Sequence, residues 1–155
     1  MAEPAHQRKL MRVRSALLLR AGVALTLGIG YYLWRRPDAL VTVLFGNLTG
    51  VTLLDIPCPI DGSMLMQCID GYLADFLWGF AMMLCMGAAC LGTGKMRAGL
   101  ALCLAADCIM ELLQGVGLIS GTFDPVDMLV QIGGTIAAQC IINLQRRKNY
   151  VGKQQ

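Results

Sequence analysis

Long apolar runs constrain the fold of this chain more than any other feature of its sequence. The runs at 71–91, 96–119 and 125–144 approach or reach the roughly 20 apolar residues that a helix needs to cross a bilayer. A fourth run at 15–34 qualifies if the Arg20 side chain extends toward a nearby interface. With 56% hydrophobic and 15% charged residues over 155 positions, the chain is too apolar for a soluble domain of this size. The sequence therefore predicts an all-α membrane protein.

The first apolar run follows a basic stretch, RKLMRVR, as a signal peptide would. No small-residue cleavage pattern follows it, and the sequence YYLWRR at 31–36 is typical of an aromatic belt with charged anchors. We therefore interpret this run as a retained membrane helix. Gly22, Thr26 and Gly30 recur on it at four-residue spacing, a pattern that favours close helix packing in lipid.

The run ALVTVLFGNLTGVTLL at 39–54 is uncharged, but Gly46, Asn47 and Gly50 interrupt it. Cytoplasmic loops are enriched in Lys and Arg, so the distribution of these residues tests whether the run crosses the membrane. If it does not cross, ten Lys and Arg residues lie inside and two, Arg35 and Arg36, lie outside. The ten are Arg8, Lys9, Arg12, Arg14, Lys95, Arg97, Arg146, Arg147, Lys148 and Lys153. If it crosses, four lie inside and eight outside. The first arrangement is favoured, and the run becomes a re-entrant or interfacial segment on the outer face, covered by protein.

The predicted organisation is a polytopic bundle of about four transmembrane helices in a bacterial cytoplasmic (inner) membrane, with both termini in the cytoplasm. It comprises a basic N-terminus at 1–14, one transmembrane domain at 15–145 and a basic tail at 146–155. The predicted helices span about 15–34, 71–91, 96–119 and 125–144, and an outer loop covers 35–70.

Most acidic residues of the spanning segments fall in the outer half of this bundle. Asp75 lies early in the second helix, and Asp124 and Asp127 open the fourth. Glu111 lies some eight residues before the predicted outer end of the third helix, roughly 12 Å below that end at the usual helical rise. Asp107 lies about one turn deeper. An acid near the centre of a spanning helix costs roughly 2.5 to 3.5 kcal/mol on insertion scales, which favours a functional role for Glu111.

Helical spacing places these polar groups on two stripes. Asp107, Glu111, Gln114 and Leu118 share one face of the third helix. Asp127, Gln131, Gly134 and Ala138 share one face of the fourth. Because a polar face in lipid must point at protein or water, we expect the two stripes to face each other.

The same residues resemble the VanZ-like family of small polytopic membrane proteins, named for a teicoplanin-resistance protein. The resemblance lies in ELLQ at 111–114, in Asp124-x-x-Asp127-x-x-x-Gln131-x-x-Gly134, and in IDGYLADFLWGFAMM at 69–83. It covers about half the chain, residues 70–142. In the family a histidine is common where Asp75 stands, an asparagine stands at Gln131, and an arginine often precedes the Asp pair, where this chain reads SGTF. The resemblance implies a membrane domain of four or slightly more helices and a link to glycopeptide tolerance, but no established reaction.

The residue types restrict the chemistry of such a site. The one histidine, His6, lies in the basic N-terminus, which excludes Ser-His catalysis and a histidine-ligated zinc site. Carboxylates and amides suit a hard divalent cation, with Glu111 and Asp127 as the first candidate ligands and Gln114 and Asp124 as further oxygen donors. They also suit proton exchange at Glu111, or a structural ion pair with Arg35 or Arg36. No other cofactor is predicted.

Two of these acids, and the cysteines, also have structural interpretations. Asp124-Pro125-Val126-Asp127 is typical of a helix start, with Asp as N-cap, Pro at the first position and an acid at the third. Asp75 could be an acid of an early turn that interfacial water satisfies. Cys58 and Cys68 lie in the predicted outer loop and could form a disulfide, whereas the other five cysteines lie in spanning helices as small hydrophobes.

Three classes of function follow from the sequence. The first is a VanZ-like protein that binds or modifies an outer-leaflet lipid, a cell-wall precursor or a glycopeptide through an acidic pocket. The second is a small proton- or cation-coupled transporter or channel subunit, which would need to form a homo-oligomer to enclose a path. The third is a structural or accessory membrane subunit. No nucleic-acid signature is present, because the positive-inside orientation and anionic lipid account for the basic termini.

Overall fold

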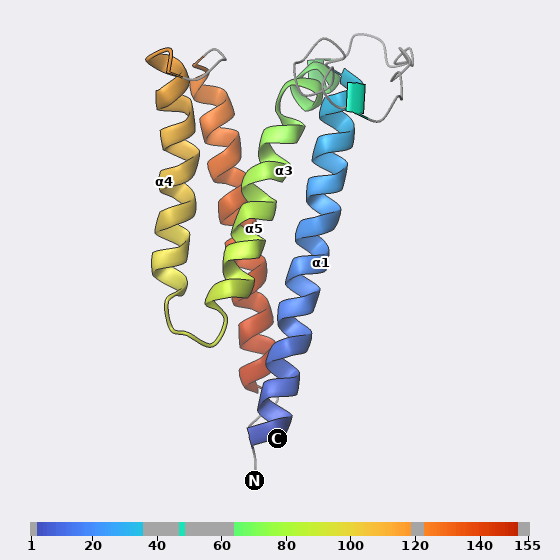
Figure 1. Ribbon diagram of the computed structural model, residues 1–155, viewed down its shortest axis with the longest axis vertical. Coiled ribbons are helices and arrows are strands. Elements are labelled where there is room, and N and C mark those ends of the chain that lie inside the picture. Colours follow the sequence, from blue (N-terminus) through green and yellow to red (C-terminus); the bar gives the residue numbers. More distant parts are fainter. Residues whose placement is uncertain (1–2, 36–46, 49–63, 119–122, 152–155) are drawn as a thin grey trace.

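The described part of the chain in the computed structural model, residues 3–35, 47–48, 64–118 and 123–151, folds into four long helices with no strand among them. They are α1 (Glu3–Arg35), α3 (Met64–Cys90), α4 (Met96–Gly115) and α5 (Pro125–Val151). The helices alternate in direction, and α1 begins at the same end of the bundle at which α5 ends (Figure 1). The all-α prediction is confirmed for these residues.

Three of the helices are long and apolar enough to cross a membrane. The segments that qualify are Gln7–Tyr32 of α1, Gly71–Cys90 of α3 and Pro125–Arg146 of α5. α4 has 20 residues, about 30 Å of helix, and carries Asp107 and Glu111. The fold is compatible with an integral membrane protein, while the crossing of α4 stays a prediction.

α3 lies at the centre of the bundle. It packs extensively against α1 and α5, and α4 makes smaller contacts with α3 and α5 (Figure 1). All four helices contribute buried apolar side chains. The buried apolar residues are Leu17, Ala21, Ala24, Ala81, Met83, Leu84, Ala88, Met96, Cys103, Ala138 and Ile142.

Two glycines allow α3 and α5 to approach at backbone distance. A Cβ atom on Gly134 would overlap the carbonyl oxygen of Phe76, and one on Gly79 would overlap the carbonyl oxygen of Gln131. Phe76 and Phe80 stack beside this crossing, with ring centroids 6.1 Å apart. Because neither position has room for a side chain, the pair of glycines sets how closely the two helices pack.

The packed face of α1 differs from the one that its small residues predict. Gly22 and Gly30 have no described neighbour within 4 Å of a Cβ atom, and both are exposed. The buried positions are instead Leu17, Ala21 and Ala24. The Gly22 stripe therefore meets no described helix of this bundle at its glycines, and its packing against another helix in lipid stays a prediction.

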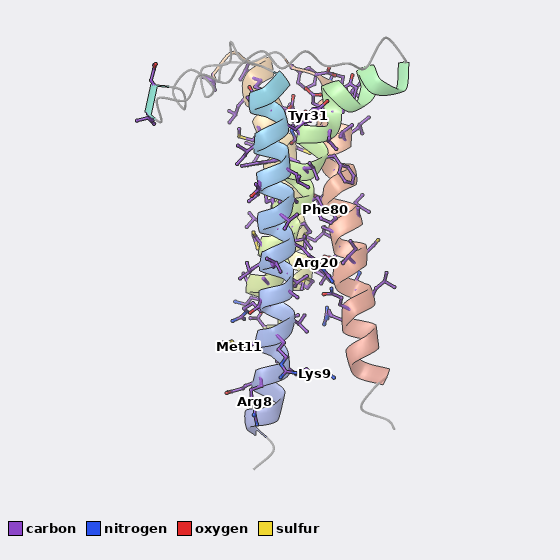
Figure 2. All side chains as sticks on the ribbon, turned by 90° about the vertical axis from the view of Figure 1, so that its right-hand side faces the viewer. Arg8, Lys9, Met11, Arg20, Tyr31 and Phe80 are labelled. Atoms are coloured by element: carbon purple, nitrogen blue, oxygen red, sulfur yellow. The ribbon has the colours of Figure 1, made fainter. Side chains whose placement is uncertain are left out.

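Polar bonds also connect α1 to its neighbours. Arg14 Nε donates to the carbonyl oxygen of Ala88 near the end of α3, at 2.9 Å. Arg20 lies at mid-height between α1 and α5 (Figure 2), and the Gln145 amide, oriented with its oxygen toward the arginine, accepts from its guanidinium. Arg20 thus has a partner inside the protein, where the sequence alone suggested extension toward the interface.

The helix ends differ from the predicted ones. α1 begins at Glu3, so most of the basic N-terminus continues the helix, and α3 begins at Met64, well before the predicted 71. α4 ends at Gly115, short of the predicted 119. The reason is a Schellman motif: Gly117 has φ +73°, its N–H donates to Gln114 O, and Leu118 N–H donates to Leu113 O.

Apart from residues 47 and 48, the predicted re-entrant segment at 39–54 lies outside the described residues.

Candidate functional site

One face of α4 turns toward the rest of the bundle. Its buried residues are Met96, Gly99, Cys103, Asp107 and Glu111, which recur every three or four positions. This face becomes acidic toward the C-terminal end of α4, where Asp107 is 1% exposed and Glu111 is 3% exposed. The predicted stripe holds for these two acids, whereas Gln114 is half-buried and Leu118 is exposed beyond the helix end.

A row of polar side chains, which we call the polar ladder, runs along α5, and one of its members, Thr135, meets this face. The polar ladder consists of Asp127, Gln131, Thr135, Gln139 and Asn143, each four residues after the last. Four residues exceed one turn, so the row rotates by about 40° per step around the helix. Gln131 and Thr135, in the middle of the ladder, are buried, whereas Asp127 and Gln139 are half-buried and Asn143 is exposed. Sequence reasoning found the first two members and missed the rest, although their constant spacing was a usable signal.

Thr135 connects Asp107 to the central helix. Its Oγ1 lies 2.9 Å from Asp107 Oδ2 on α4 and 3.2 Å from the carbonyl oxygen of Gly79 on α3. A threonine hydroxyl carries one proton, so it can donate to only one of these oxygens at a time. If Asp107 Oδ2 carries a proton and donates it to Thr135, the hydroxyl is free to donate to Gly79, and both contacts become hydrogen bonds. The three groups therefore form a complete chain with one added proton.

The second oxygen of Asp107 has a different environment. Asp107 Oδ1 is buried and has no hydrogen-bond partner among the described residues. A buried charge with so few donors is costly, whereas a neutral carboxyl needs fewer partners. Gln139 Oε1, one step along the polar ladder, is likewise buried without a described partner. The middle of the bundle thus holds two polar atoms that a proton, water or cation could satisfy.

Glu111, near the end of α4, bonds to the start of α5. Its Oε2 accepts from the backbone N–H of Asp124 at 3.3 Å, and Asp124 Oδ1 accepts from the N–H of Val126 at 2.8 Å. The predicted N-cap role of Asp124 is confirmed. In a capping box the third helical residue bonds to the N-cap N–H, and here Glu111 supplies that bond from another helix. Since α4 ends at Gly115, Glu111 lies about one turn from its end, shallower than predicted.

The remaining predicted site residues lie around these two groups. Gln131 Nε2 donates to Asp75 Oδ1 at 3.3 Å, which joins α5 to α3. Asp75 lies about three turns into α3, because that helix begins earlier than predicted, and about one turn into its membrane-length segment, Gly71–Cys90. Asp127 is half-buried in the first turn of α5, and Gln114 contributes its carbonyl oxygen to the end of α4. The predicted α5 stripe thus meets α3 through Gln131 and Gly134, so the prediction that it faces the α4 stripe is not confirmed. The α5 residue that meets Asp107 is Thr135, which the predicted stripe did not include.

Two other site predictions have a more limited outcome. Among the described residues, no group of three or more His, Cys, Asp or Glu side chains is placed to hold a metal ion. A divalent cation at Glu111 and Asp127 therefore gains no support. Cys58 lies outside the described residues, so its disulfide with Cys68 stays a prediction, whereas Cys85, Cys90, Cys103, Cys108 and Cys140 are free thiols.

Comparison of the chain with protein-family models, with curated proteins and with solved structures gives no match. The resemblance to VanZ-like proteins stays a prediction from the motifs.

Proposed function

We propose that this protein exchanges protons across part of a membrane, and that the carboxyl group of Asp107 is the group that takes up and releases them. One observation carries the proposal. A carboxyl that is 1% exposed shares a single hydroxyl with a backbone carbonyl, and its other oxygen has no described partner. Both contacts of the Thr135 hydroxyl become hydrogen bonds when Asp107 Oδ2 holds a proton, whereas the charged carboxylate is buried with few donors, so the surroundings of Asp107 distinguish its two protonation states.

The polar ladder supports a route between Asp107 and the two ends of the bundle. Its members run along most of α5, are exposed or half-buried toward the helix ends, and are buried beside Asp107. Polar side chains of this kind hold the water that carries protons between helices. A single bundle of four helices encloses little space, so a complete path calls for a second copy of the chain. The function is then that of a small proton-coupled transporter or channel subunit acting as a homo-oligomer.

A second candidate keeps the interpretation suggested by the VanZ-like resemblance. In that case the protein binds or modifies an outer-leaflet lipid or a cell-wall ligand, and glycopeptide tolerance depends on it. The observation in its favour is that Glu111, Asp124 and Asp127 gather where α4 ends and α5 begins, at one end of the bundle. A ligand could reach the half-buried Asp124 and Asp127 from the membrane surface, with the buried Glu111 behind them.

The test is proton flux into vesicles that contain the purified protein. In Asp107→Asn the amide keeps the volume of the side chain and can still donate to Thr135, but it cannot exchange an acid proton. We expect flux to fall to the level of protein-free vesicles while the variant still folds. Thr135→Val, which removes the shared hydroxyl, should lower flux as well. Asp124→Asn, outside the polar ladder, is the matched control and should conduct normally.

Normal flux through Asp107→Asn would show that the Asp107–Thr135 bond is architectural. The second candidate makes a different prediction in cells, where glycopeptide susceptibility is the measurement. Loss of tolerance in Glu111→Gln and Asp127→Asn, with Asp107→Asn unaffected, would favour ligand binding over proton exchange.

A further inference from the structure

A group of basic residues lies toward the end of the bundle that holds the turn between α3 and α4. This end is opposite to the one at which Glu111 and Asp124 lie. Two arginines on α1 are engaged within the protein: Arg14 bonds to Ala88 O, and Arg20 bonds to Gln145. Arg146 on α5, by contrast, makes no hydrogen bond or ion pair with any residue that the structure describes. It is therefore available for a ligand.

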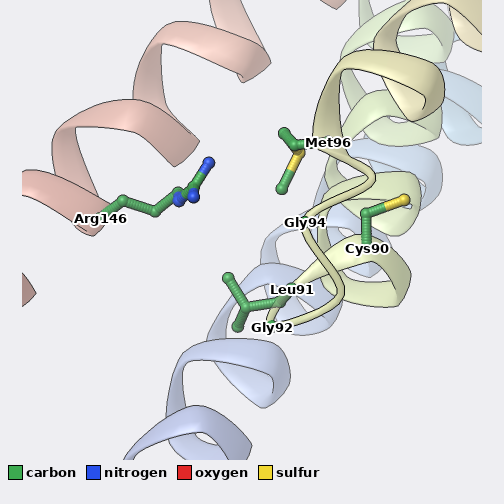
Figure 3. A pocket seen from close by; sticks show the side chains of 6 residues that line it. All are labelled: Cys90, Leu91, Gly92, Gly94, Met96 and Arg146. Carbon is green, nitrogen blue, oxygen red and sulfur yellow. The ribbon is translucent and has the colours of Figure 1, made fainter.

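Arg146 points toward a cavity of about 190 Å³ beside this turn (Figure 3). The other lining residues are Cys90, Leu91, Gly92, Gly94 and Met96. Gly92 and Gly94 have φ of +85° and +75°, so the turn presents backbone to this space where side chains would be strained. The cavity is smaller than the roughly 300–1,000 Å³ that encloses a drug-sized ligand, so it suits a single small group.

The chemistry of the lining favours an anion. The guanidinium of Arg146 is a planar fork of donors that matches a phosphate. Met96 begins α4, where the first backbone N–H groups lack helical partners and Lys95 provides no side-chain cap. Lys95 and Arg97 are exposed on the same turn and add positive potential.

The position of the cavity indicates where its ligand comes from. The membrane-crossing segments of α3 and α5 end at Cys90 and Arg146, and both residues line the cavity. It therefore lies at the level of the membrane–water boundary, where basic pockets between helices meet lipid headgroups.

We infer that this cavity binds a phosphate group, through Arg146 and the backbone at the start of α4. The headgroup of an anionic phospholipid is one source of that phosphate, and a soluble phosphate compound is the other. The inference is independent of proton exchange at Asp107.

The experiment measures binding of a short-chain phosphatidylglycerol and of inorganic phosphate to the full-length protein in a neutral detergent. Arg97→Gln is the matched control, because it removes one charge from the same turn without altering the lining. Loss of one surface charge costs about fivefold in affinity for an anionic lipid. Arg146→Gln also removes a charge-assisted hydrogen bond, so we expect it to weaken binding about tenfold more than Arg97→Gln. Thermal unfolding of each variant checks that it is folded.

Competition by inorganic phosphate would identify a soluble phosphate as the ligand, and binding of lipid without such competition would identify the headgroup. Equal weakening by Arg146→Gln and Arg97→Gln would reduce the effect to general surface charge and overturn the inference. Failure of folded protein to bind either probe would overturn it too.

Discussion

Asp124 shows how one residue can cap a helix with its side chain and contact another helix through its backbone. Its carboxylate accepts from Val126 N–H, and its own N–H is bonded by Glu111 on α4. The sequence Asp-Pro-Val-Asp was sufficient to predict the first bond, because N-cap chemistry is local. The second depends on where α4 ends relative to α5, which local sequence does not encode.

The capping interaction predicts a graded loss of stability at position 124. Asp124→Ala should lower the free energy of unfolding by about 1 kcal/mol, because it leaves the first N–H groups of α5 without their acceptor. Asp124→Asn should cost only a few tenths of a kcal/mol, since Asn caps a helix about as well. Thermal or denaturant unfolding in detergent measures both. Equal losses for Ala and Asn would show that charge, and not the cap, is what Asp124 provides.

The choice between Asp107 and Glu111 could not be made from sequence. Both are predicted in the acidic cluster, with Asp107 about one turn deeper, and the cost of an acid inside a spanning helix favours function at Glu111. The glycine-rich end of α4 stops the helix at Gly115, which brings Glu111 within one turn of the end and leaves Asp107 as the deep carboxyl. Gly117, whose φ is positive, ends α4 and thereby sets how far the Glu111 side chain lies from the end of the helix.

At the scale of elements, the crossing of α3 and α5 is the closest helix contact described. Gly79 and Gly134 face the backbone of the other helix, and Thr135 follows directly after one of them. The glycines thereby bring the Thr135 hydroxyl within reach of Gly79 O. The position of the polar ladder beside Asp107 depends on this contact.

Two neighbouring glycines of α5 provide a matched pair for testing it. Gly134→Ala should destabilise the protein by about 1–3 kcal/mol, because the new methyl group meets the backbone of α3. Gly133→Ala meets nothing within 4 Å and should be neutral or slightly stabilising, by up to about 1 kcal/mol. Unfolding of the two variants under the same conditions gives the comparison. If Gly134→Ala were as stable as Gly133→Ala, the backbones would not approach as described.

The small-residue patterns of α5 and α1 differ in whether they lie in a helix interface of this bundle. Gly134 and Ala138 lie in the helix interface, whereas Gly22 and Gly30 face outward from α1. The physical reason is that lipid is as apolar as a protein core, so hydrophobicity does not distinguish the packed face of a membrane helix. On α5 the small residues continue a row of acidic and amide side chains, whereas the Gly22 stripe of α1 continues no such row.

For the whole molecule, the alternation of helix directions agrees with the predicted four-helix arrangement. α1 begins, α5 ends and α3 turns into α4 toward one end (Figure 1). Most Lys and Arg residues of the described helices and of this turn lie in the segments that meet there. Apolar length and the distribution of Lys and Arg were enough to predict the helices and their alternation. They could not predict that α3 would be central, because that depends on glycine contacts between elements distant in sequence.

Single cysteines on either side of α4 test this arrangement. Lys95→Cys and Leu118→Cys place thiols at two exposed positions before and after the helix, in a background without reactive native cysteines. A membrane-impermeant maleimide should label position 118 in intact cells and position 95 only after permeabilisation. Labelling of both positions in intact cells would mean that α4 does not cross, and labelling of position 95 alone would invert the topology.

The interhelix bonds of Asp107 and Glu111 also bear on how the chain enters the membrane during synthesis. α4 emerges from the ribosome before α5, yet its two acids find their partners, Thr135 and the N–H of Asp124, on α5. Alone in lipid, an acid near the centre of a helix costs roughly 2.5–3.5 kcal/mol on insertion scales, and Asp107 is the nearer of the two to the centre of α4. The insertion machinery would therefore retain α4 until α5 arrives, and the two helices would pass into the bilayer together as a hairpin.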